Sequence, residues 1–302
     1  MKYFLKQMVL GTTVALSLEK KQFEQLKLSR NILLSAKAIE EKYDLLIANF
    51  LEFEKEILTQ VAQQMILSEH SYENFYDLRI VLNRRVVNLL TSTKLYSDQI
   101  EKHVRICLCN ENTSEKVVKP YFSEEYDLHL EYRFMEALRN YVQHYGLAVH
   151  SLSLPSNWVE NGENKEQINT IKLSSSKEEL SKDKSFKKKT LSEIDDKTDL
   201  VKSTRVYVGS FSKVHQKIRD LIETNVIAAR YDIENTIERY KNVNSERAVG
   251  LYAYSILGDN PREEPIEKFP ILLDWDNVRV RLTNKNRAFP NISQWYVTSR
   301  CL

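Results

Sequence analysis

The stretch Phe134–Gly146, FMEALRNYVQHYG, combines the apolar spacing of a buried helix with an arginine, an asparagine and a histidine. On a helical wheel of about 100° per residue, apolar residues cover well over half of the circumference. They are Leu128, Leu130, Tyr132, Phe134, Met135, Ala137, Leu138, Tyr141, Val142 and Tyr145. This pattern predicts a helix that is buried on most of its sides.

The remaining sector of this helix is polar. Its residues are His129, Arg133, Glu136, Asn140, Gln143 and His144, with Arg139 at the border. Burying polar groups without partners costs ~1–3 kcal/mol each, so we expect this sector to face a cleft, a partner subunit or solvent. Glu136 and Asn140 are four residues apart, as are Asn140 and His144, so a carboxylate or an amide is placed to orient the imidazole.

Arginine and histidine together suit chemistry on phosphate esters. The guanidinium group is a planar fork that matches phosphate oxygens, and an imidazole titrates near neutral pH. His144 lies in the last predicted turn, where the negative end of the helix dipole favours the imidazolium form. By spacing alone, however, a structural role for Arg139 and His144 is the more common outcome.

Helical periodicity extends outward through most of the chain. Apolar residues recur every three or four positions from Lys20 to about Leu67, and again after the SEHS break until the polar NENTSEK. A third helix is predicted over 123–145, capped by Ser123 and ended by Gly146 in the left-handed conformation. A fourth is predicted from about Tyr207 to Lys241. Only six glycines and six prolines occur in 302 residues, which favours long helices.

We therefore predict a mainly α protein, a bundle of long antiparallel helices with a small irregular or β insertion and a C-terminal extension. Residues 1–19 lead into the first helix as a strand or irregular segment. The bundle spans 20–245 and includes the motif helix 123–145 and a charged connection at 174–202. Residues 147–173 form a strand pair or an ordered loop. Prolines oppose helix in the extension 246–302, so loop and short strand are expected there.

Charge and cysteine content restrict the partners. Lys plus Arg is 44 against 42 for Asp plus Glu, and the net charge of +2 gives no global attraction to nucleic acid. The segment that contains residues 187–189 is either a solvated connection, which is the more common case, or a local basic patch that contacts RNA. Three cysteines are too few and odd in number for a disulfide framework, which indicates a reducing, cytoplasmic compartment. No apolar segment approaches the ~20 residues that span a bilayer, so no membrane partner is predicted.

Three weaker signals concern histidines, cysteines and carboxylates. Cys107 and Cys109, with His103 nearby, resemble a fragment of a metal site, but ordinary helix cysteines explain them better. Asp274 and Asp276 would point to one side of a strand and could bind a cation, although a turn beside Trp275 is favoured. His150 either joins the cleft or is a loop histidine without a role. We predict no metal site.

The six residues RNYVQH, Arg139–His144, match the R-N-x-x-x-H signature, and the chain in this respect resembles the HEPN superfamily. Members are helical bundles common in toxins and defence proteins, and many are metal-independent ribonucleases. The resemblance implies a homodimer whose motif helices line one cleft, RNA as substrate, no cofactor, and a separate antitoxin as a further partner. More broadly, the chain resembles an uncharacterised bacterial helical family.

Carried over residue by residue, the resemblance gives Arg139 the role of binding the scissile phosphate. Asn140 would orient the phosphate or the histidine, and His144 would serve in acid–base catalysis. Glu136 and Tyr145 are expected to support these residues, from helix spacing only. Two alternatives stay open: a non-catalytic helical dimer or scaffold that uses the polar face for subunit contacts, and a module that binds nucleotides without cleaving them.

Overall fold

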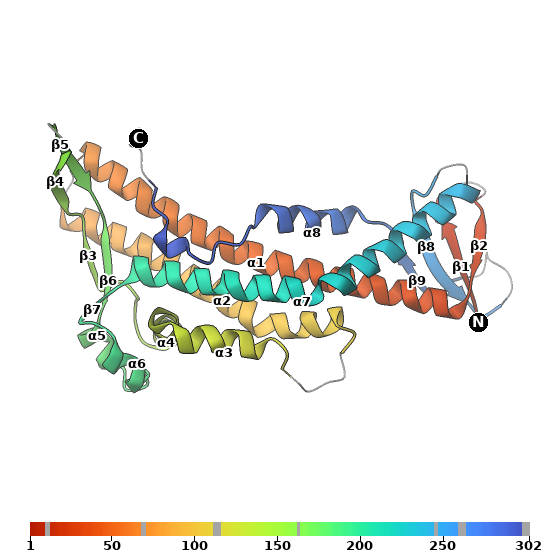
Figure 1. Cartoon of the computed structure of the whole chain (residues 1–302), viewed down its shortest axis with the longest axis horizontal. Coiled ribbons are helices and arrows are strands. Elements are labelled where there is room, and N and C mark those ends of the chain that lie inside the picture. Colours follow the sequence, from red (N-terminus) through yellow and green to blue (C-terminus); the bar gives the residue numbers. More distant parts are fainter. Residues whose placement is uncertain are drawn as a thin grey trace. The chain divides into compact units, whose positions relative to one another are not determined.

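A computed structural model gives the architecture of residues 1–9, 13–67, 71–110, 116–161, 164–244, 247–258 and 264–297. It confirms the mainly α class and the bundle of long helices (Figure 1). The three longest helices are α1 (Lys20–Leu67), α2 (Tyr72–Cys107) and α7 (Leu200–Val243). Each lies close to its predicted position.

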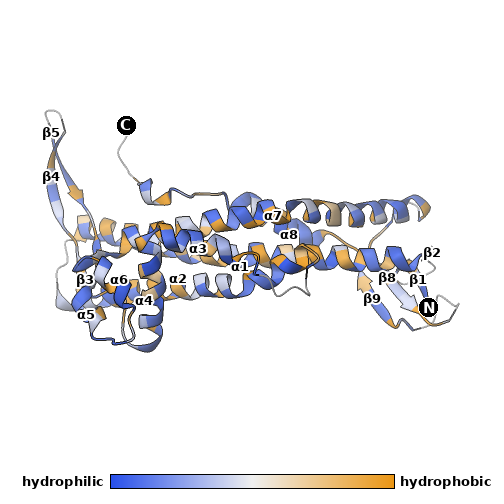
Figure 2. Ribbon diagram, turned by 60° about the horizontal axis from the view of Figure 1, so that its bottom comes forward, coloured by the Kyte–Doolittle hydropathy of each residue, from blue (hydrophilic) through white to orange (hydrophobic). Residues whose placement is uncertain are grey.

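Periodic apolar residues explain why these three helices pack together. Hydrophobic and hydrophilic residues alternate along them (Figure 2), and most side chains at the predicted apolar positions of α1 are buried, among them Ile39, Tyr43, Leu46 and Phe53, whereas Met65 near its end is exposed. Helices α1 and α7 are antiparallel neighbours. Glu54 of α1 pairs with Arg205 of α7, and the earlier Glu40 pairs with the later Arg219.

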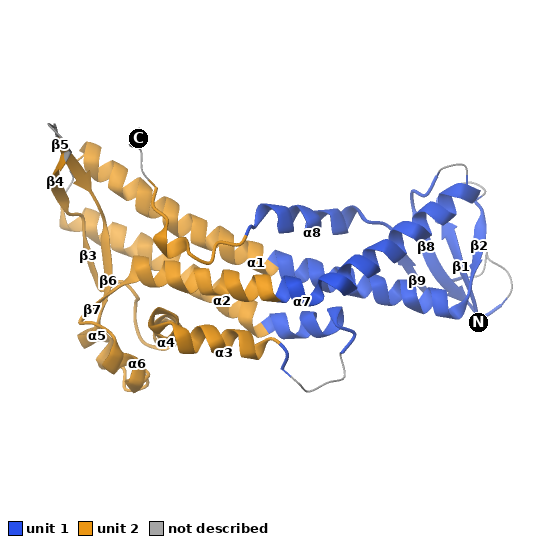
Figure 3. Cartoon of the chain, in the orientation of Figure 1, with its two compact units in different colours: residues 1–41, 99–117, 218–287 blue, residues 42–98, 118–217, 288–302 orange. Residues whose placement is uncertain are grey.

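The chain divides into two compact units, shown in different colours in Figure 3. Unit 1 comprises residues 1–41, 99–117 and 218–287, and unit 2 comprises 42–98, 118–217 and 288–302. Unit 1 holds an antiparallel sheet in the order β2-β1-β8-β9, followed by α8. Its elements are β1 (Lys2–Gln7), β2 (Ala15–Leu18), β8 (Leu251–Ile256), β9 (Glu267–Pro270) and α8 (Asp274–Lys285).

Unit 2 holds the motif helix and the β insertion. Two short helices, α3 (Lys119–Leu128) and α4 (Leu130–His144), precede a three-stranded antiparallel sheet in the order β3-β6-β7 and a β4-β5 hairpin. The remaining elements are β3 (Ser151–Ser153), β4 (Ser156–Asn161), β5 (Asn164–Asn169), β6 (Lys172–Ser176), α5 (Lys177–Ser181), α6 (Lys188–Glu193), β7 (Lys197–Asp199) and the 3-10 turn η1 (Ile292–Gln294). Strand pairing confirms the first of the two options predicted for residues 147–173.

The single motif helix predicted over 123–145 is wrong. The chain breaks at His129, whose backbone is extended with φ −119° and ψ 117°, and two helices result. The break lets Arg133 reach back and donate to the carbonyl oxygens of Tyr126 and Asp127, at 3.2 and 3.1 Å. A cation at the C-terminal end of α3 satisfies carbonyls that the helix leaves open.

The predicted ends of this segment also need correction. α3 begins at Lys119, with a proline in its first turn, so Ser123 lies inside the helix and does not cap it. Gly146 does not adopt the left-handed conformation, since Gly250 is the glycine with positive φ among the described residues. Position 146 favours glycine for another reason: an added Cβ would lie 2.6 Å from the hydroxyl of Tyr141, so the tyrosine would have to shift.

The prediction of loop and short strand for the C-terminal extension is partly wrong. Strands β8 and β9 form, but Asp274–Lys285 is helix α8. Three prolines of the extension precede Asp274 and Pro290 follows Lys285, so none of them interrupts this helix. Asp274 and Asp276 therefore do not alternate along a strand. Asp274 is exposed, and Asp276 is fully buried between two arginines.

Candidate functional site

Helix α4 places the motif at its C-terminal end. Its buried residues are Tyr132, Phe134, Met135, Ala137, Leu138, Arg139 and Tyr141. The apolar members anchor the helix in unit 2, as the wheel predicted. Arg139 is the unexpected member, because the wheel placed it at the border of the polar sector and its side chain retains only 11% exposure.

Arg139 is held by two neighbours on the same helix. Its Nη1 donates to Glu136 Oε2 at 3.0 Å, and its Nη2 donates to Asn140 Oδ1 at 3.0 Å. The Nε atom is buried and has no hydrogen-bond partner among the described residues. Glu136, Arg139 and Asn140 therefore form one polar network, which we call the Arg139 cluster.

Helix α7 fixes the carboxylate of this cluster from the other side. The buried hydroxyl of Tyr207 donates to Glu136 Oε1 and lies 3.3 Å from the hydroxyl of Thr93 on α2. Burial, reinforced by the charge of Glu136, raises the pKa of Tyr207 well above its ordinary value. Tyr207 therefore stays protonated at neutral pH and acts as a permanent donor to Glu136.

His144 lies in the last turn of α4 and is exposed, as is Asn140 one turn before it. His144 makes no hydrogen bond or ion pair within the part of the chain that the structure describes. The structure therefore brings Glu136, Arg139 and Asn140 together but leaves His144 outside the cluster. Tyr145 is exposed and its ring lies 5.3 Å from that of Tyr141.

A second histidine lies beside the motif helix. The backbone N–H of Ser176 on β6 donates to His150 Nδ1 at 3.0 Å, and His150 Nε2 lies 3.3 Å from the hydroxyl of Tyr141. Because Nδ1 accepts, the neutral ring carries its proton on Nε2 and donates to Tyr141. Burial lowers the pKa of His150, which favours this neutral form. Sequence spacing gave no signal for this contact, because β6 supplies it.

A basic pocket opens near the start of α4. It has a volume of about 570 Å³ and is lined by Tyr126, Asp127, Arg133, Lys187, Lys188, Lys189 and Thr190. Arg133 links two sides of the pocket. Its Nη2 donates to Glu193 of α6 at 2.7 Å, and its Nη1 donates to the end of α3. The pocket contains the three lysines that the sequence marked as a candidate basic patch.

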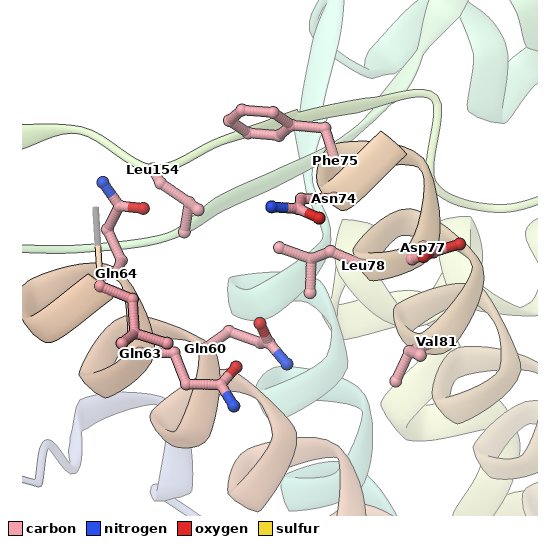
Figure 4. Close-up of a pocket in the computed structure, with 10 residues that line it drawn as sticks. Gln60, Gln63, Gln64, Asn74, Phe75, Asp77, Leu78, Val81 and Leu154 are labelled. Carbon is pink, nitrogen blue, oxygen red and sulfur yellow. The ribbon is translucent and has the colours of Figure 1, made fainter. Parts of the chain in front are cut away.

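A separate pocket of about 270 Å³ lies between α1 and α2 (Figure 4). Gln60, Gln63 and Gln64 of α1 face Asn74 and Phe75 of α2 across it, with Leu154 closing one side. Its lining is mainly amide and apolar. None of the motif residues contributes to it, so it belongs to a different part of unit 2 from the Arg139 cluster.

The weak metal signals do not combine into a site. Cys107 is buried at the end of α2, with Sγ 3.5 Å from the carbonyl oxygen of Ile32, and burial raises the pKa of its thiol to about 12. Cys109 is exposed, and Cys301 lies outside the described residues. Across the described ranges, no group of three or more histidine, cysteine or acidic side chains is arranged to hold a metal ion.

We compared the chain with known families, proteins and structures. No family model, no curated protein and no solved structure matches the chain. Among the helices that the structure describes, none combines the length and apolar character needed to cross a bilayer.

Proposed function

We propose that the protein is a metal-independent endoribonuclease of the HEPN type, toxin-like or defence-related, that acts in the cytoplasm as a homodimer. The observation that supports this is the end of α4, where a guanidinium fixed by Glu136 and Asn140 precedes an exposed imidazole at His144. Arg139 and His144 are five residues apart, a rise of about 7.5 Å along the helix. One helix end thus offers a phosphate-binding group and a proton-transfer group.

Cleavage would proceed by attack of the RNA 2′-oxygen on the adjacent phosphorus. A bond forms between the 2′-oxygen and phosphorus, and the bond from phosphorus to the 5′-oxygen breaks. A base takes the 2′-hydroxyl proton, and an acid gives a proton to the leaving 5′-oxygen. The products are a 2′,3′-cyclic phosphate and a 5′-hydroxyl, and no metal or cofactor enters this balance.

Arg139 keeps hydrogen-bonding capacity for a phosphate. A guanidinium has five N–H groups, and Glu136 and Asn140 occupy one on each Nη. One N–H on each Nη is left for phosphate oxygens. Glu136 in this account fixes the orientation of Arg139, and Asn140 holds its other edge.

The need for two proton-transfer groups supports a homodimer. The exposed end of α4 presents one imidazole per chain, that of His144, whereas the reaction needs a base and an acid. Two copies that bring their α4 ends together supply both. A separate antitoxin that covers these exposed ends would hold the enzyme inactive.

The test compares three proteins incubated with total RNA in a chelator: the wild type, His144→Ala and Gln143→Ala. Gln143 is the exposed neighbour of His144 and serves as the matched control. We expect cleavage by the wild type and by Gln143→Ala, and a loss of at least about 100-fold in His144→Ala, since acid–base groups contribute 10²–10⁴-fold. Equal cleavage by all three would show that His144 has no catalytic role.

A second candidate function is a non-catalytic helical dimer or scaffold. The observation that favours it is the burial of Arg139, whose ion pair with Glu136 is complete within one subunit. In this case the exposed Asn140, His144 and Tyr145 form subunit contacts. Sedimentation would then show a weaker dimer for His144→Ala, with no RNA cleavage by the wild type. An unchanged dimer affinity would count against the scaffold.

A further inference from the structure

We propose that the basic pocket at the start of α4 binds phosphate groups of the single-stranded RNA that is cleaved at the end of the same helix. This inference rests on the proposed ribonuclease function and assigns a substrate-binding site to it. The pocket is lined by Arg133 and by three consecutive lysines, Lys187, Lys188 and Lys189, with one acidic residue, Asp127. Arg133 is paired with Glu193, and the three lysines outnumber Asp127, so the pocket is positive although the whole chain carries only +2.

The lysines of this pocket are not neutralised by the protein. Lys188 and Lys189 are exposed and have no ion-pair partner among the described residues. The amino group of Lys187 lies 3.3 Å from the hydroxyl of Tyr126 and 5.0 Å from the centre of its ring, and both contacts are with a neutral side chain. Most other charges near α4 are paired. Three adjacent cations without counter-ions raise the local potential and attract a polyanion.

Arg133 makes this pocket a fixed structure. Its guanidinium joins the end of α3 to Glu193 on α6, and its Nε is buried without a partner among the described residues. Because Arg133 lies on α4, the lysines are held at a set place relative to the motif helix. The contacts of Arg133 therefore hold α3, α4 and α6 together around the pocket.

The geometry of α4 aligns this pocket with His144. Arg133 and His144 are eleven residues apart, which is about 20° around the helix axis and about 16 Å along it. Asn140 lies on the same stripe, about 20° to the other side of Arg133. A strand bound at the lysines would have to cover about 16 Å to reach the imidazole, with the exposed Asn140 in between. A free phosphate ion would fill only a small part of 570 Å³.

The experiment measures binding of a fluorescein-labelled single-stranded RNA by anisotropy, in a His144→Ala background so that cleavage does not interfere. The pocket variant is Lys187→Gln/Lys188→Gln/Lys189→Gln. The control, Lys20→Gln/Lys21→Gln/Lys268→Gln, removes the same charge from exposed lysines of unit 1. Circular dichroism checks that both variants are folded, and inorganic phosphate is titrated as a competitor.

We expect the pocket variant to bind RNA at least about tenfold more weakly at low salt, and the control less than about twofold. The slope of log affinity against log salt should fall by about 2, because each lost phosphate contact on a single strand removes about 0.7. Equal affinity of pocket variant and control would overturn the inference. RNA binding no tighter than binding of inorganic phosphate would also overturn it and leave only a site for a small anion.

The two proposals can fail separately. Pocket-dependent RNA binding without cleavage by the wild type would support the pocket as an RNA-binding site and contradict the ribonuclease. Cleavage that depends on His144 but not on the three lysines would support the ribonuclease and contradict this inference.

Discussion

At the scale of the single residue, Glu136 holds the motif together. It accepts from Arg139 through one oxygen and from Tyr207 through the other. Arg139 is buried, so its charge needs this counter-ion within the subunit. The wheel placed Glu136 in the polar sector correctly, but it could not show that Tyr207, 71 residues later, completes the network.

Replacing Glu136 by glutamine should therefore destabilise the fold. The amide keeps the shape but removes the negative charge opposite Arg139. We expect a loss of about 1–3 kcal/mol in the free energy of unfolding, below the value for a fully buried pair because the Glu136 and Arg139 side chains are 20% and 11% exposed. Urea denaturation measures it. The control Glu41→Gln removes an exposed partner of Lys37 and should change stability by less than about 0.5 kcal/mol.

His150 should make stability depend on pH. Burial lowers its pKa in the folded protein below the value of about 6.5 of the unfolded chain. The unfolded state then binds more protons as pH falls below 6.5, so the free energy of unfolding decreases there and is fully restored above 6.5. In His150→Gln, the loss of stability between pH 7 and pH 5, measured by urea denaturation, should be smaller than in the wild type. An identical loss in both proteins would contradict this assignment.

At the scale of the element, short-range signals set where helices run, and long-range contacts set where they end. Periodicity located α1, α2 and α7 because each buries a regular apolar face. The same signal missed the break at His129, since both sides of the break continue the apolar pattern. The stabilising contact is the reach of Arg133 to two carbonyl groups of α3, which no local pattern encodes.

Helix α8 provides a test at this scale. Asp276 is fully buried and accepts from Arg230 of α7 at 2.6 Å and from Arg279 of its own helix at 2.6 Å. Asp276→Asn removes the counter-ion of Arg279 and leaves Arg230 with only the exposed Glu234, so we expect a loss of about 2–5 kcal/mol in stability. Asp274→Asn is the matched control at the exposed start of α8, with an expected loss of about 0.3–1 kcal/mol. Thermal unfolding of the two variants would refute this account if they lost equal stability.

At the scale of the whole molecule, the class of the fold was predictable and its division into units was not. Few glycines and prolines and long apolar periods indicated helices over most of the chain. The sheet of unit 1, however, pairs β1 with β8, joining Leu5 to Ala253 across most of the sequence. β1 and β8 are far apart in the sequence, and no short turn connects them. Their pairing therefore could not be predicted from the sequence.

The candidate site shows the same limit. Five candidate site residues were predicted from one helix. Three of them, Glu136, Arg139 and Asn140, form the Arg139 cluster, and His144 and Tyr145 lie outside it. The second partner of Glu136 and the position of His150 come from α7 and β6, so they could not be predicted from α4 alone. The basic pocket likewise requires α3, α4 and α6 to meet.

The most direct measurement of the central claim is the chemistry of the RNA ends that the wild-type protein produces in a chelator. Mass spectrometry of a cleaved oligoribonucleotide identifies them. The account predicts 2′,3′-cyclic phosphate and 5′-hydroxyl ends, absent when His144→Ala replaces the wild type, because the 2′-oxygen is the nucleophile. Products with 5′-phosphate ends, or an intact oligoribonucleotide, would contradict it.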